Sequence, residues 1–191
     1  TVEDYARLFF YGTDTKKAAD GIFGLEKNWE GAPETNPQID NTLRIFEELK
    51  KDYPTLSDNW RFLLCLFRAK TDAYVKFRVS DDRKAIKSTA AFIKRGELKK
   101  AREVLSSPYS SEIAKIRQDI EATAEKLFEL IGIQLGTVRF HADGWERGAV
   151  LDTVDLPVSD RQWLLYKLAC AEKTDGAHAR DCMMRALERN K

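Results

Sequence analysis

Residues 139–158 have no helical periodicity and combine two glycines, one proline and several carboxylates. The acids of this stretch and its border are candidates for a pair that does acid and base work, because glycoside hydrolysis uses two carboxyl groups about 5–10 Å apart; they are Asp143, Glu146, Asp152, Asp155 and Asp160. Sequence spacing does not determine that separation. Asp152 and Asp155 also suit turns, where they accept backbone hydrogen bonds, and Asp160 suits the start of a helix. Both interpretations stay open at this point.

His141 and Trp145 lie in the same segment, beside Asp143 and Glu146. A histidine among acids can serve as a base, a ligand or a hydrogen-bonding loop residue, since its pKa lies close to neutrality. Trp145 follows a glycine in irregular sequence, and binding residues are disproportionately found in loops. We therefore count His141 and Trp145 as candidate substrate-binding residues.

A second constellation lies in the longest apolar stretch of the chain. Arg61, Arg68 and Asp72 are spaced by seven and four residues, so they fall near one face of a helix. Charged groups on an otherwise apolar helix must be paired or must reach a polar cleft. Trp60 and Tyr74 would be the aromatic walls of such a cleft. The alternative is a structural ion pair in which Arg68 and Asp72 are partners.

Trp29 also has two interpretations. It follows Ala18, Ile22 and Leu25 at helical spacing, so we expect it in the core. In the other interpretation, Trp29 belongs to the surface of the polar cleft, together with Glu26 and Glu30.

Metal and nucleophile chemistry have little support in the chain. Its two histidines and three cysteines form no His-x-x-x-His, Cys-x-x-Cys or Gly-x-Ser-x-Gly motif, and we expect no metal and no cofactor. Cys65 stands in an apolar run and is predicted to be a small buried hydrophobe. A disulfide between Cys170 and Cys182, across a turn between two helices, remains an open alternative.

Composition narrows the class of protein. The chain has 191 residues, 43% of them hydrophobic, and 32 basic against 31 acidic side chains give a net charge of +1. The apolar fraction is sufficient for a folded core. The balanced charge gives no reason to expect a nucleic-acid partner. No apolar run reaches the roughly 18 residues that a membrane span needs, so we expect no membrane insertion.

The elements that position these residues are predicted to be helices. Apolar spacing predicts helices over 2–11, 18–29, 37–53, 57–79, 85–95, 98–105, 110–135, 159–171 and 177–187. Asn36 and Pro37 are typical of a helix start, Thr55 and Asp58 have the spacing of a capping box, as do Ser159 and Gln162, and Gly96 is typical of a tight turn. We predict an all-α fold, an antiparallel bundle of about eight helices with one long irregular loop at 139–158. That loop is expected to contain a short β-hairpin that pairs 149–151 with 153–156.

No linker divides the chain, so we expect a single domain over residues 1–191, cut from a larger protein. Residues 91–101 and 163–187 each have the helix-turn-helix rhythm of a tetratricopeptide repeat. They lack a fixed period, and ordinary helical hairpins give the same rhythm.

Several segments taken together resemble the helical region that follows the glycoside-hydrolase-like barrel of large bacterial multidomain proteins. They are Tyr5–Phe10 with Gly12, Leu25–Gly31, Asn59–Phe62 with Arg68, Asp72, Ala73 and Tyr74, and Arg147–Pro157 with Trp163 and Leu164. The resemblance implies a non-catalytic accessory domain that packs on a barrel of the same polypeptide and lines a glycan cleft. It also implies an extracellular or periplasmic location, which the residues themselves do not indicate.

That accessory role is our leading hypothesis. A helical, repeat-like module that binds another protein is the alternative, and a stand-alone hydrolase that uses loop carboxylates ranks third. The candidate substrate-binding residues are Trp60, Arg61, Arg68, Asp72, Tyr74, His141, Trp145, Asp152 and Asp155.

Overall fold

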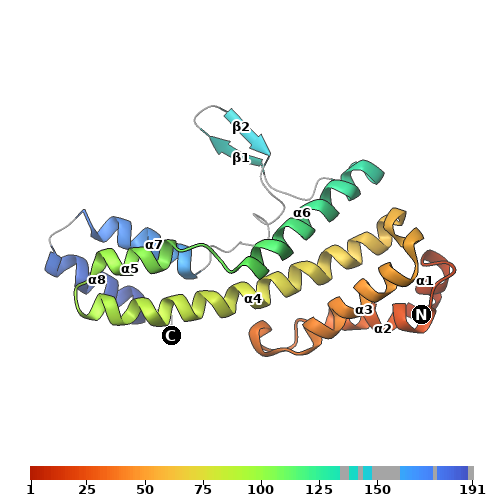
Figure 1. Cartoon of the computed structure of the whole chain (residues 1–191), viewed down its shortest axis with the longest axis horizontal. Helices are drawn as coiled ribbons and strands as arrows, with labels where there is room; N and C mark the ends of the chain where they lie inside the picture. The colour runs from red at the N-terminus through yellow and green to blue at the C-terminus, as the bar shows by residue number, and fades with distance from the viewer. Residues whose placement is uncertain (134–137, 142–143, 148–159, 174–175, 189–191) are drawn as a thin grey trace. The chain divides into compact units, whose positions relative to one another are not determined.

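The computed structural model describes residues 1–133, 138–141, 144–147, 160–173 and 176–188. Within these residues the chain forms eight α-helices, two short 3₁₀ helices and one two-stranded hairpin (Figure 1). The fold is therefore all-α, as the helical periodicity predicts. No helix in the described part combines the length and apolar character that a membrane span requires.

The described residues form two compact units, which we call the first and second units. The first unit draws on Thr1–Phe77 and Ser111–Val154, and the second on Arg78–Ser110 and Asp155–Lys191. Helix α4 (Trp60–Lys94) contributes residues to both. We expected a single domain from the sequence, and that expectation stays a prediction, because two compact units can still fold as one domain.

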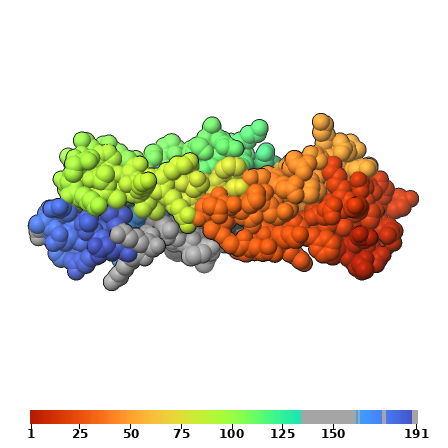
Figure 2. Space-filling view, turned by 90° about the horizontal axis from the view of Figure 1, so that it is seen from below, coloured from red at the N-terminus to blue at the C-terminus, as the bar shows by residue number. Residues whose placement is uncertain are grey.

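Most elements belong to the first unit. Besides the start of α4 it contains α1 (Val2–Phe9), α2 (Thr15–Lys27), η1 (Pro33–Thr35), α3 (Gln38–Asp52), η2 (Pro54–Asp58), α6 (Ser111–Ile131), β1 (Val138–His141) and β2 (Gly144–Arg147). The red and orange atoms of α1, α2 and α3 form one continuous face in Figure 2. The second unit contains the rest of α4 with α5 (Leu98–Ser106), α7 (Asp160–Ala171) and α8 (Gly176–Glu188).

Polar side chains cap the starts of α1, α2 and α4. Thr1 and Asp4 form a reciprocal capping box on α1, and Asp14 accepts a hydrogen bond from the Lys17 amide at the start of α2. The α4 cap differs from our prediction. Asn59, rather than Thr55 and Asp58, accepts hydrogen bonds from the Arg61 and Phe62 amides, at 3.1 and 3.2 Å. Residues 54–58 form the 3₁₀ helix η2 instead of opening α4.

Helix α4 is longer than its apolar pattern predicts. We expected one helix to end near Val79 and another to begin near Ala85, but α4 continues unbroken from Trp60 to Lys94. The polar run at 80–84 contains no glycine or proline, so nothing in it interrupts the backbone hydrogen bonds. The turn predicted at Gly96 is confirmed, with a positive φ of 76°.

A hairpin lies at the start of the irregular segment. Strands β1 and β2 pair antiparallel, with Val138 opposite Arg147 and His141 opposite Gly144. The pairing expected between 149–151 and 153–156 falls outside the described residues, as does the predicted Ser159 cap. Helix α6 ends at Ile131, before the predicted end near residue 135, and Gly132 follows with a φ of 66°.

Aromatic rings fill the centre of the first unit. Phe62 of α4 meets Phe10 at 5.6 Å and Phe46 at 5.8 Å between ring centroids, both edge to face. Leu66 and Leu127 are buried in the same cluster, so α1, α3, α4 and α6 share one core. Such edge-to-face pairs add to the stabilisation from burying the rings themselves.

Two glycines let α2 approach α3 closely. A Cβ at Gly24 would collide with the Thr42 hydroxyl, and a Cβ at Gly21 would lie 3.0 Å from a methyl group of Ile45. Because neither glycine has a side chain, the end of α2 lies directly against α3. This approach brings the residues after Lys27 next to Thr42.

The second unit has a core of its own. Ile93, Leu105, Leu164, Leu168 and Met183 are buried together in it. The buried Arg161 guanidinium donates a hydrogen bond to the Leu105 carbonyl oxygen at 2.8 Å and so satisfies the end of α5.

Candidate functional site

The predicted pair of Arg68 and Asp72 is present on α4. Arg68 Nε donates a hydrogen bond to Asp72 Oδ1 at 2.9 Å. Asp72 is only 5% exposed, whereas the Arg68 side chain reaches the surface. Among the described residues, the two Nη groups of Arg68 have no hydrogen-bond partner. The pair therefore leaves guanidinium donors available at the surface.

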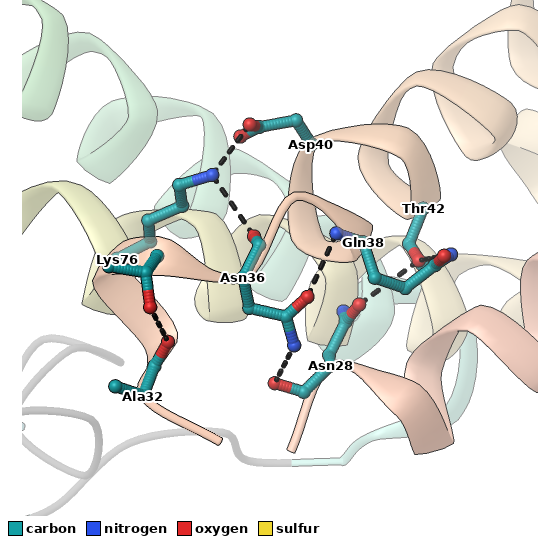
Figure 3. A network of polar contacts seen from close by, with 8 residues as sticks. Asn28, Ala32, Asn36, Gln38, Asp40, Thr42 and Lys76 are labelled. Atoms are coloured by element: carbon teal, nitrogen blue, oxygen red, sulfur yellow. Dashed lines mark hydrogen bonds and ion pairs between the residues drawn. The ribbon is translucent and has the colours of Figure 1, made fainter. Parts of the chain in front are cut away.

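Residues far away in the sequence complete the shell of Asp72. Asn28 Nδ2 donates to Asp72 Oδ2 at 2.9 Å, and the Thr42 hydroxyl donates to Asn28 Oδ1 at 3.0 Å. The Thr42 oxygen in turn accepts a hydrogen bond from Gln38 Nε2 at 3.0 Å. Figure 3 shows Asn28 between Asn36 and the pair of Gln38 and Thr42. The buried carboxylate is therefore held by Arg68 of α4 and by Asn28 after α2, and Thr42 of α3 fixes Asn28 in turn.

A second set of contacts fixes the loop after α2. Asn36 Nδ2 lies within 3.0–3.2 Å of the carbonyl oxygens of Lys27, Asn28 and Glu30, and its Oδ1 accepts from the Gln38 amide. Lys76 Nζ donates to the Asn36 carbonyl oxygen at 3.1 Å (Figure 3). The loop is thus tied to both α3 and α4.

This loop lines an open cavity of about 210 Å³ in the first unit, together with residues of α3 and α4. Its lining includes Asn28, Trp29, Pro33 and Asp72. Trp29 is 68% exposed as a residue, and the Arg68 guanidinium carbon lies 5.0 Å from the centroid of its ring. The cavity therefore combines an exposed aromatic face with a buried carboxylate and a buried amide.

Our core assignment for Trp29 is wrong. Helix α2 ends at Lys27, so Trp29 no longer follows the helical stripe that starts at Ala18. The alternative, in which Trp29 shares a surface with the polar groups of α4, agrees with the contact between Trp29 and Arg68.

Burial sets the electrostatics of this cavity. Desolvation raises the pKa of the Asp72 carboxyl above its ordinary value. The hydrogen bond from Asn28 and the charge and hydrogen bond of Arg68 lower the pKa and partly oppose that shift.

The two predicted aromatic walls do not form a cleft. Tyr74 is 1% exposed and belongs to the interior, so its assignment as a wall is wrong. Trp60 lies fourteen residues away on the same helix, a rise of about 21 Å. The Arg61 guanidinium stacks between Trp60 and Phe9, at 4.1 and 4.2 Å from their ring centroids. Trp60 and Arg61 therefore belong to the packing at the start of α4, away from the Asp72 cavity.

The described lining of this cavity contains Asp72 but none of the other predicted site residues. His141 and Trp145 lie on β1 and β2, and their roles stay predictions. Asp152 and Asp155 lie outside the described residues.

The cysteines of the chain are free thiols. Cys170 and Cys182 therefore form no disulfide. Cys65 is half-buried, and desolvation raises the pKa of its thiol to about 11. In the described part of the chain, no three His, Cys, Asp or Glu side chains gather as metal ligands would.

Comparison with known proteins identifies no relative. No protein-family model, curated protein or solved structure matches the chain.

Proposed function

We propose that this chain is a non-catalytic accessory region of a carbohydrate-active protein and that the Asp72 cavity binds one sugar residue of a glycan. The packing of this region on a barrel of the same polypeptide is part of the proposal. The observation that carries the sugar assignment is the exposed Trp29 ring beside a buried, hydrogen-bonded carboxylate.

The chemistry of the cavity suits a sugar ring. One face of a pyranose presents C–H groups that pack on an indole, and its hydroxyls need donors and acceptors held in fixed positions. Asp72 and Asn28 are fixed by their mutual hydrogen bond, and Arg68 adds unused donors at the edge. The 210 Å³ volume lies below the roughly 300–1,000 Å³ of pockets for drug-sized ligands, which favours a single residue.

The same cavity favours binding over hydrolysis. Asp72 is the one carboxylate among the described residues that line it, and both of its oxygens already accept hydrogen bonds. Glycoside hydrolysis commonly needs two carboxyl groups across the scissile bond. The hydrolase hypothesis depends on the carboxylates of residues 139–158, which are a different part of the sequence.

Titration with a panel of neutral mono- and oligosaccharides, followed by tryptophan side-chain NMR and calorimetry, tests the proposal. We expect Trp29→Ala to weaken binding about tenfold or more, equivalent to about 1.4 kcal/mol. The free energy of unfolding should fall by less than about 1 kcal/mol, because the exposed ring loses mainly its contact with Arg68.

Tyr11→Ala is the matched control, since Tyr11 is an exposed aromatic residue that does not line the cavity. It should leave sugar affinity unchanged. Equal losses of affinity in the two variants, or a panel in which no sugar shifts the Trp29 indole signal, would contradict the proposal.

A further inference from the structure

A second cavity in the first unit is lined by several lysines. It has a volume of about 260 Å³ and is lined from α3, η2, α4 and α6. Three of its lining residues are lysines, Lys50, Lys70 and Lys126, and Asp119 is the one carboxylate in the described lining. The hydroxyls of Ser57 and Thr123 also line it.

Lys70 is the least solvated of the three lysines. It is 7% exposed, and its ammonium lies 3.5 Å from Thr123 Oγ1 and 3.4 Å from Glu47 Oε1. Both contacts are longer than the 2.7–2.9 Å of a strong charge-assisted hydrogen bond. The Glu47 carboxylate is itself half-exposed, so water screens its attraction. These two contacts therefore offset only part of the cost of removing the Lys70 ammonium from water.

The two outer lysines differ in their partners. Lys126 Nζ lies 3.1 Å from Asp58 Oδ1 and 4.0 Å from Glu129 Oε2, and both of these carboxylates are well exposed. Lys50 has no ion-pair partner in the part of the chain that the structure describes. Like charges that converge on a cavity repel each other, and a bound anion relieves that repulsion.

We propose that this cavity binds a doubly charged oxyanion group, a phosphate or a sulfate. Such a group presents four oxygens and up to two negative charges to the ammonium donors, whereas a carboxylate presents two oxygens and one charge and a chloride presents a single acceptor atom. Thr123 orients the Lys70 ammonium. Its hydroxyl donates to the Asp119 carbonyl oxygen at 2.7 Å, so its oxygen accepts from Lys70. The other N–H groups of Lys70 are then available to donate to the anion.

Calorimetric and thermal-shift titrations with inorganic phosphate, and separately with sulfate, test this site. Sodium chloride at matched ionic strength is the reference, because it screens surface charge without supplying the oxyanion. We expect phosphate to raise the melting temperature above the chloride reference. A response to phosphate alone identifies a phosphate site, and a response to both anions identifies a general dianion site.

Variants distinguish phosphate binding in the cavity from nonspecific attraction to surface charge. Lys50→Gln should weaken phosphate binding about tenfold, the loss expected for one charge-assisted hydrogen bond. Lys51→Gln is the matched control, since Lys51 is the exposed neighbour on α3 and does not line the cavity. Lys70→Met should abolish the response that is specific to phosphate while it keeps the aliphatic stem packed.

If Lys70→Met fails to fold, as circular dichroism would show, Lys50→Gln and Lys126→Gln decide the question. Equal phosphate affinity in Lys50→Gln and Lys51→Gln would overturn the proposal. So would a wild-type response to phosphate no larger than the response to chloride.

Discussion

Asp72 is the residue on which the candidate sugar site depends. Part of its environment follows from the sequence, because Arg68 lies four residues earlier on one helix and such pairs are local. Asn28 lies 44 residues away, and no helical period links the two. Trp29 shows the same limit, because the end of α2 at Lys27 decides whether it is core or surface.

The buried carboxyl of Asp72 predicts a pH dependence of stability. Because its pKa is raised above 3.8 in the folded chain, the native state holds more protons than the unfolded state between 3.8 and the raised value. The free energy of unfolding therefore increases as the pH falls through that window and decreases as the pH rises through it. Asp72→Asn lacks this contribution. Urea denaturation measures this at several pH values from about pH 4 to pH 7. The free energy of unfolding of the wild type, relative to that of the variant, should decrease as the pH rises. Parallel profiles would contradict the prediction.

At the scale of the helices, composition and periodicity predict more than capping patterns do. The stripe of α6 is confirmed by the burial of Ile113, Ile120 and Leu127, and the turn at Gly96 lies where expected. The predicted break after Val79 is wrong, because a polar stretch without glycine or proline continues a helix as readily as it ends one. The contact of Gly24 with Thr42 depends on tertiary packing and leaves no local signal.

The start of α4 offers a test of which residue caps it. Asn59→Ala should lower the free energy of unfolding by about 1–2 kcal/mol, because its side chain satisfies two amides and also donates to the Phe9 carbonyl oxygen. Thr55→Ala, at the position that the sequence pattern suggests, should change it by less than about 0.5 kcal/mol. Chemical denaturation measures both, and the reverse order would restore the predicted capping box.

At the scale of the whole molecule, the all-α class is confirmed by the structure, whereas a division into two units has no signal in the composition. No proline-rich or charged linker marks it, since α4 passes from one unit to the other as continuous helix. Two separate apolar clusters are visible only once side chains are placed.

Two cores predict two levels of local stability. Leu168→Ala removes a fully buried side chain from the second core and should cost about 2–5 kcal/mol there. Hydrogen exchange should accelerate in α5, α7 and α8 and stay near wild-type rates in α2 and α3. Equal acceleration in all five helices would mean that the chain unfolds as one cooperative domain, as its unbroken sequence suggests.

The state of the cysteines has a practical consequence for labelling. Because burial holds the Cys65 pKa at about 11, that residue is almost entirely a neutral thiol at neutral pH, and alkylating reagents attack thiolates. Cys170 is exposed on α7 and Cys182 is half-buried on α8. A maleimide dye or spin label added under mild conditions will therefore attach first to Cys170. That places a reporter group in the second unit while both candidate sites of the first unit remain chemically untouched.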